Sequence, residues 1–269
     1  MVRTKKFRIL FYFRIILVSI STSNIFIFLI KLMDKTEYAY AQVRKSLAEK
    51  IDSKLLVGSL PSERELCQSY DISRSTLRQA LGQLENMGLI YRKNRSGWYV
   101  CPRKLKYDPM QHVSFLQYTT EQDFEPSTVL VNQVKQKPCK EIADALNLDK
   151  RASITSILRV RSVDGRAVVV EDLNFSNKLL PNIDKHDLSL SISKLLKNTY
   201  HHTHVNYDVI VESCCLFNPI AHHLDTYDGA LGLKVTRVVR DKHGVAFEFD
   251  REFWRHDALK IENKAELNF

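Results

Sequence analysis

Two arginines, Arg74 and Arg78, stand four residues apart in a polar, basic segment of the chain. If this segment is helical, residues four apart lie one turn from each other, so both guanidinium groups point the same way. Guanidinium groups presented in this manner hydrogen-bond to guanine edges or to phosphates in the major groove of DNA. The spacing therefore indicates a nucleic-acid-binding face. The alternative is an arginine-rich helix face that is only solvated.

The surrounding residues predict the helices that hold this pair. Apolar residues recur every four positions over 40–55, which favours a first helix. Ser62 and Glu65 have the spacing of a capping box, in which each side chain bonds the other residue's backbone N–H, so a second helix is expected from Ser62 to about residue 70. Ser73 is a suitable N-cap for a third helix, which ends near Met87 because Gly88 can adopt the left-handed conformation.

Two short strand-like runs, 89–92 and 97–100, follow the third helix and are joined by a basic turn. Gly97 stands where the second run begins, and a glycine there lets the backbone approach a phosphate or the minor groove closely. Three helices followed by a two-stranded basic wing predict a winged helix-turn-helix over 33–101.

The segments 60–66, 73–81, 84–90 and 97–100 resemble, in this order, the DNA-binding domain of GntR-type transcriptional regulators. The resemblance implies that Arg74 and Arg78 contact bases, and that Arg64 and Gly97 contact phosphates or the minor groove. The full set of DNA contacts that it implies is Arg64, Arg74, Ser75, Thr76, Arg78 and Gly97.

Beyond a proline-containing charged stretch, 102–112, which we interpret as a linker, the pattern changes to strands with short helices between them. Runs over 154–163 and 167–174 flank Asp164-Gly165, a hairpin turn, and a second hairpin is expected over 231–254. The sequence therefore predicts an α+β class domain with an antiparallel sheet over 113–265.

The segments 158–161, 170–172 and 253–257 in this domain resemble the ligand-sensing UTRA domain of the HutC subfamily of GntR regulators, a domain related in fold to chorismate lyase. The resemblance implies a cytoplasmic, nucleoid-associated homodimer that binds operator DNA and a small, often anionic effector, and no enzymatic activity. Within the subfamily, 95–109 and 249–262 are similar to regulators of operons for 2-aminoethylphosphonate uptake and degradation.

A phosphonate needs paired cationic groups, and its ammonium group needs a carboxylate. Arg159 and Arg161 lie two apart, hence on one face of a strand, and they correspond to the subfamily's ligand-binding arginines. Glu171 lies across the hairpin at a position where the family makes a polar contact, and Asp250 is a second candidate for the amine. Two alternatives stay open: these residues form exposed cross-strand ion pairs, or the effector is another small anionic metabolite, such as a sugar phosphate or an amino-acid derivative.

Other chemistry has little support in the sequence. The histidines at 201, 202, 204, 222 and 223 lack accompanying cysteine or carboxylate ligands, so we expect surface histidines and no metal site. No phosphate-binding glycine loop or hydrolase motif is present in the sequence, and no catalytic residue or cofactor is expected.

Residues 1–32 carry six basic side chains and no acidic one, and they include an uncharged stretch over 15–30. Three explanations stay open: translation begins at Met33, residues 9–32 tether the protein to a membrane, or the segment is a cleaved signal. We favour the first, because the rest of the chain resembles a cytosolic regulator. Residues 33–106 carry 14 basic and 8 acidic side chains against 20 and 23 over 107–269, so the positive charge belongs to the DNA-binding part.

Overall fold

The computed structural model describes residues 39–93, 96–110, 114–149, 151–203 and 205–262. The leader over 1–32 lies outside the described residues. Within those ranges, no helix is both long and apolar enough to cross a bilayer. The chain separates into two compact units. The first contains the residues up to Val57 together with Pro61–Leu84, and the second contains Gly58–Leu60 together with the residues from Glu85 onward.

The first unit is the three-helix bundle that the sequence predicts. It contains a helix whose described part spans 39–52, then α3 (Glu63–Tyr70) and α4 (Arg74–Asn86). The capping box is confirmed, because the Ser62 N–H donates to Glu65 Oε2 over 2.8 Å and the Glu65 N–H donates to Ser62 Oγ. The apolar side of each helix is buried, with Val43, Leu47, Leu66, Leu77 and Leu81 among its least exposed residues.

The wing is a two-stranded antiparallel ribbon. Strand β1 (Ile90–Lys93) pairs with β2 (Gly97–Val100), and Lys93 lies opposite Gly97. Gly88 has a φ of +64°, as the predicted end of the third helix requires.

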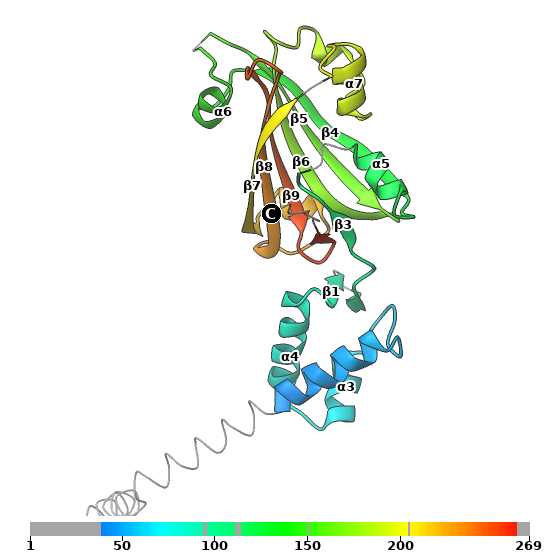
Figure 1. The fold of residues 1–269 in the computed structure, drawn as a ribbon. Coiled ribbons are helices and arrows are strands. Elements are labelled where there is room, and N and C mark those ends of the chain that lie inside the picture. The colour runs from blue at the N-terminus through cyan, green and yellow to red at the C-terminus, as the bar shows by residue number, and fades with distance from the viewer. Residues whose placement is uncertain (1–38, 94–95, 111–113, 150, 204, 263–269) are drawn as a thin grey trace, which may run out of the picture. The chain divides into compact units, whose positions relative to one another are not determined.

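The second unit is built on a six-stranded antiparallel sheet (Figure 1). The strand order is β4-β5-β6-β9-β8-β7, so both predicted hairpins, β5–β6 and β8–β9, are confirmed as neighbouring pairs. The strands are β4 (Pro126–Gln136), β5 (Ile154–Val163), β6 (Arg166–Ser176), β7 (Asn206–Leu216), β8 (Ala230–Arg240) and β9 (Ala246–Arg255).

Short helices cover both faces of this sheet (Figure 1). On one face, α5 (Phe115–Thr120) packs near Trp254, while α7 (Ile192–Asn198) and the 3-10 turn η1 (Ile183–Lys185) pack around Phe175. On the other face lie α6 (Lys140–Ala145) and α8 (Ile220–His223). Because apolar residues cover both faces of the sheet, polar side chains that are buried on these faces are unusual.

The interpretation of 102–112 as a linker is wrong for its middle. Leu105–Tyr107 form strand β3, which pairs in parallel with β10 (Leu259–Ile261). Leu105 and Tyr107 are buried, whereas Lys106 between them is exposed. A three-residue strand flanked by prolines and lysines gives too short an alternation to identify from sequence.

Candidate functional site

Helix α4 has one buried and one exposed side. Leu77, Leu81 and Leu84 are fully buried, while Arg74, Ser75 and Arg78 are exposed. The Arg78 guanidinium is held by an ion pair 3.0 Å long between its Nε and Glu63 Oε2, and its side chain is still 66% exposed. Arg64 on α3 is exposed as well. The arginines of the predicted DNA-contact set are therefore exposed, Arg74 and Arg78 on the N-terminal half of α4 and Arg64 on α3.

Thr76 differs from the other residues of that set. Its side chain is buried, and its hydroxyl lies 2.8 Å from Ser73 Oγ. Ser73 Oγ also accepts from the Thr76 N–H over 3.2 Å, the N-cap bond expected from the sequence. The side chain of Thr76 therefore fixes the start of α4 in this conformation instead of projecting with the arginines.

Gly97 opens β2 with a φ of +96°, a conformation that other residues rarely adopt. No atom lies within 4 Å of the place where a Cβ would stand, so the constraint on this position is conformational and not steric. The neighbouring wing cations lie over aromatic rings, with Lys93 Nζ 6.0 Å from the Tyr99 ring centre.

The second unit contains a cavity between one face of the sheet and the elements α5, β3 and the start of α7. All four residues proposed from the sequence to bind ligand line it, namely Arg159, Arg161, Glu171 and Asp250. The sequence analysis missed other polar residues that line the same cavity: Tyr107, Tyr118, Arg237, Glu248 and Glu252.

Strand register explains why these residues meet. Arg159 on β5 is paired with Glu171 on β6, and Glu171 is paired with Glu252 on β9. Asp250, two residues before Glu252, is paired with Arg237 on β8. Since alternate residues of a strand share a face, these side chains form charged rows on the cavity face.

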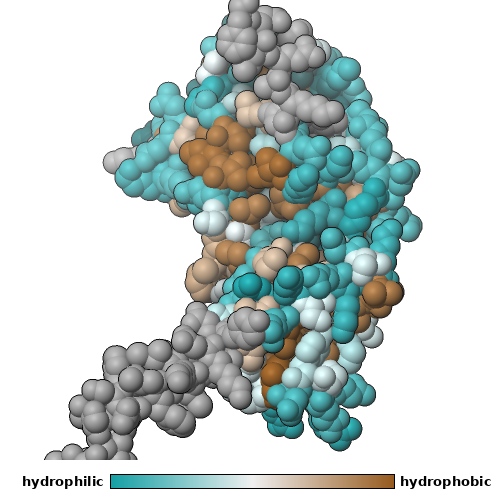
Figure 2. Space-filling view, turned by 60° about the horizontal axis from the view of Figure 1, so that its bottom comes forward, coloured by the Kyte–Doolittle hydropathy of each residue, from teal (hydrophilic) through white to brown (hydrophobic). Residues whose placement is uncertain are grey.

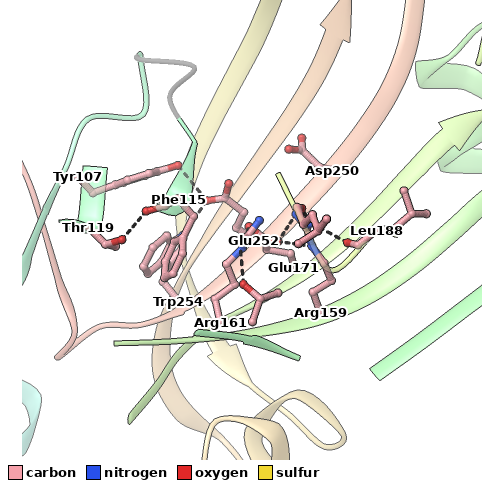
Figure 3. Close-up of polar contacts among 12 residues, drawn as sticks. Tyr107, Phe115, Thr119, Arg159, Arg161, Glu171, Leu188, Asp250, Glu252 and Trp254 are labelled. Carbon is pink, nitrogen blue, oxygen red and sulfur yellow. Dashed lines mark hydrogen bonds and ion pairs between the residues drawn. The ribbon is translucent and has the colours of Figure 1, made fainter. Parts of the chain in front are cut away.

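Glu171 joins the two arginines of β5 (Figure 3). Its Oε2 lies 2.6 Å from Arg159 Nη2, and its Oε1 lies 2.7 Å from Arg161 Nε. Arg159 Nη1 donates to the carbonyl oxygens of Leu188 and Leu190. Arg159 is only 2% exposed and Arg161 7%, so the alternative of exposed cross-strand pairs is wrong.

The contacts of Glu171 with the two arginines also determine its protonation state. Burial raises the pKa of Glu171, but the two guanidinium groups outweigh it and hold that pKa below its ordinary value. Arg161 also donates to Thr128 Oγ1 over 3.0 Å, and its guanidinium lies 4.8 Å from the Phe115 ring centre. The floor of the cavity is therefore an ionised cluster fixed by its own bonds.

A second buried cluster is centred on Glu252. Tyr107 Oη and Trp254 Nε1 donate to Glu252 Oε2 over 2.9 and 2.7 Å, and Arg237 bonds both Glu252 and Tyr107. Strand β3, expected to be linker, thus supplies a side chain of the cavity. The signal for Glu252 and Glu248 was present in the sequence, because this strand carries acidic residues at the alternate positions 248, 250 and 252.

Among the described residues, no three His, Cys, Asp or Glu side chains are grouped so as to hold a metal ion. His204 lies outside those residues. The ring of His202 stacks on Phe247 with the ring centres 4.4 Å apart.

Comparison with known proteins agrees with both units. Residues 39–100 match the family of bacterial regulatory proteins called the gntR family, and residues 121–260 match the UTRA domain. The chain is 27% identical to the uncharacterized HTH-type transcriptional regulator YihL of Escherichia coli, over 76% of this chain and 87% of YihL. It is also 27% identical to the HTH-type transcriptional repressor NagR of Bacillus subtilis, over 74% of this chain and 82% of NagR.

The fold is that of the crystal structure of PhnF from Mycobacterium smegmatis, with a TM-score of 0.59 and 21% identity over 84% of this chain and all of that one. The families and relatives are transcriptional regulators and not enzymes. The chain therefore belongs to the gntR family of bacterial regulatory proteins and is a ligand-responsive transcriptional regulator with a UTRA domain.

Proposed function

We propose that this regulator is an operator-binding homodimer whose UTRA cavity binds a small phosphonate such as 2-aminoethylphosphonate, and that the ligand changes the population of the DNA-competent form. The observation that carries the proposal is the convergence of three buried arginines, Arg159, Arg161 and Arg237, on one cavity. Buried guanidinium groups around a small cavity are suited to a multiply charged oxyanion.

Arg161 is the arginine best placed to bind the anion. Arg159 is occupied by Glu171 and two backbone carbonyls, and Arg237 by Glu252 and Tyr107. Arg161 donates to Thr128 through Nη1 and forms an ion pair with Glu171, so it makes fewer hydrogen bonds than the other two arginines. A phosphonate oxygen at the Arg161 guanidinium would therefore bind without breaking the Arg159–Glu171 pair.

Two edge strands of the sheet support a homodimer. Exposed apolar side chains occur on β4 at Val129 and Val131, and on β7 at Ile210 and Val211. Figure 2 shows apolar patches on one, mostly hydrophilic, face of the molecule. Exposed apolar strand edges are typical of surfaces that pair with another chain. A dimer would also present two copies of α4 to the two halves of a palindromic operator.

Calorimetry of the full chain with 2-aminoethylphosphonate, together with gel shifts on the DNA flanking its gene, tests the proposal. We expect saturable binding heat, loss of that heat in Arg161→Met, and a ligand-dependent change in the DNA shift. Absence of heat with both 2-aminoethylphosphonate and ethylphosphonate would contradict a phosphonate effector. A monomeric mass by light scattering at DNA-binding concentrations would contradict the dimer.

A further inference from the structure

Gly82 is an unusual glycine, because it lies inside helix α4, eight residues after Arg74 and four before Asn86. After proline, glycine is the least favourable residue in a helix interior, since it loses the most backbone freedom on folding. Six of the eight glycines in the chain have a positive φ, and Gly232 has no room for a Cβ, which would meet Leu216 Cδ2 at 2.6 Å. Gly82 has neither reason, because its φ is not positive and a Cβ there would meet no atom of the described residues within 4 Å. The free protein would therefore be more stable with alanine at this position.

Gly82 lies on the exposed side of α4. At about 100° per residue, position 82 falls about 20° from Ser75 and about 40° from Arg78 around the helix axis. The fully buried residues Leu77 and Leu84 lie about 140–160° away from it. Gly82 is therefore on the face whose N-terminal residues are expected to contact DNA, about 10 Å farther along the helix than Ser75.

The charges on this face favour an anionic partner. Residues 74–84 include Arg74 and Arg78 and no acidic residue, and both arginines are exposed. Without a side chain at position 82, a partner drawn to these arginines can reach the main chain of the helix. A second copy of the chain docked through the same face would bring like charges together, so DNA is the partner that the charges favour.

We propose that Gly82 is a positioning residue of the DNA interface: the DNA backbone approaches the main chain of α4 at this glycine, and the missing side chain sets the depth at which Arg78 enters the major groove. The inference rests on the operator binding in the proposed function, and it is independent of the effector and of the cavity. Arg78 makes the base contact, and Gly82 allows the helix to come close enough for it.

Base contacts are more sensitive to this depth than phosphate attraction is. A hydrogen bond to a base edge needs a donor–acceptor distance of about 2.7–3.2 Å, so an outward shift of the helix by roughly 1 Å weakens it steeply. Attraction between the arginines and the phosphates falls off over a Debye length of about 10 Å, and the same shift changes it little. A side chain at position 82 should therefore reduce specificity before it reduces general DNA binding.

The test is a size series at position 82 in the full chain, made of Gly82→Ala and Gly82→Leu. The probes are a duplex that the parent chain enriches from a random-sequence pool and a random duplex of the same length, compared by fluorescence anisotropy at one salt concentration. Both variants should melt a few degrees higher than the parent, because alanine and leucine favour a helix more than glycine does. Affinity for the enriched duplex should fall from Gly to Ala to Leu, by roughly tenfold or more for Gly82→Leu, since at least one base contact is lost.

Two controls separate positioning from other effects. Affinity for the random duplex should fall much less in both variants, because the arginines that attract phosphates remain. Ser69→Leu places the same side chain at an exposed position of α3, about 140° around that helix from Arg64, and should leave both affinities unchanged.

A Gly82→Leu variant that binds the enriched duplex as tightly as the parent overturns the inference and leaves operator binding intact. A lower mass of this variant by light scattering, with unchanged DNA affinity, assigns the face to a second copy of the chain and overturns the inference as well. If the parent enriches no duplex, the operator binding of the proposed function fails, and the inference fails with it. If Gly82→Leu melts below the parent, the affinity of Gly82→Ala alone decides the outcome.

Discussion

Glu171 stands directly opposite Arg159 in the β5–β6 register, and its Oε2 lies 2.6 Å from Arg159 Nη2. The same carboxylate contacts Arg161, so one acidic residue orients two guanidinium groups. The anionic effector that we propose would therefore meet arginines whose positions are fixed before it arrives, which reduces the entropy lost on binding.

The first prediction concerns the stability of this cluster. Glu171→Ala leaves Arg159 and Arg161 buried without their carboxylate, and breaking a buried ion pair by removing one partner costs about 3–5 kcal/mol. Urea unfolding of the full chain should show this loss. The matched control is Glu212→Ala, which removes an exposed pair with Lys234 and should cost about 0–1 kcal/mol. Equal losses in the two variants would mean that Glu171 adds nothing through its charge.

The second prediction concerns acid stability at Asp257. Burial raises the pKa of this carboxyl, but hydrogen bonds and charge from Arg255, with the charge of Arg166, outweigh it and lower the pKa to about 2. Since the folded pKa lies below the unfolded value, the stabilisation is present above about pH 4 and is lost as pH falls through 2.

Asp257→Asn should therefore be less stable than the parent chain by about 2 kcal/mol near pH 6. The difference should shrink towards pH 2, as measured by urea unfolding across the pH series. Asp144→Asn provides the control, because Asp144 pairs with Lys140 on the exposed surface of α6 and should show no such convergence. A difference that stayed constant with pH would mean that Asp257 acts through packing alone.

The sequence predicted the parts of the fold that depend on local patterns. The Ser62–Glu65 capping box and the Asp164-Gly165 turn were recognisable because each is set by residues close in sequence. Strand β3 was taken for linker, since its pairing with β10 joins residues about 150 positions apart and leaves no local pattern.

Part of the cavity was also predictable, because some of its residues are close together in the sequence. Arg159, Arg161 and Glu171 lie on one hairpin, so their shared face follows from alternation and the turn. Arg237, Glu248 and Glu252 reach the cavity only through the β6–β9 and β8–β9 pairings, and β6–β9 joins strands far apart in the sequence. Burial of charged residues cannot be foreseen until the helices that cover them are placed.

The third prediction concerns the start of α3. Ser62→Ala removes the side-chain acceptor for the Glu65 N–H, and loss of such a cap costs about 1 kcal/mol. Thermal unfolding should show a lower melting temperature. Ser69→Ala is the control, because the Ser69 hydroxyl bonds a carbonyl within the helix and caps nothing. A Ser62→Ala variant as stable as the parent would mean that water replaces the cap without cost.

The fourth prediction concerns DNA recognition by Arg78. Arg78→Ala should weaken binding to the specific operator by about 1–3 kcal/mol, the range for one guanidinium that contacts a base. Non-specific binding should change much less. Gel shifts with operator and random DNA at one salt concentration measure both. Lys45→Ala, on the helix over 39–52, removes an exposed cation and should leave the specificity ratio unchanged.

The last prediction concerns Glu63, which pairs with Arg78 through Nε while the Arg78 side chain stays largely exposed. Glu63→Gln should keep the side-chain size but weaken this orientation. The positive charge remains, so attraction to phosphates and the salt dependence of non-specific binding should not fall. The ratio of operator to random-DNA affinity should fall, because the guanidinium would no longer be held for a base edge. If specificity were unchanged in Glu63→Gln while Arg78→Ala lost it, the ion pair would have no part in positioning Arg78.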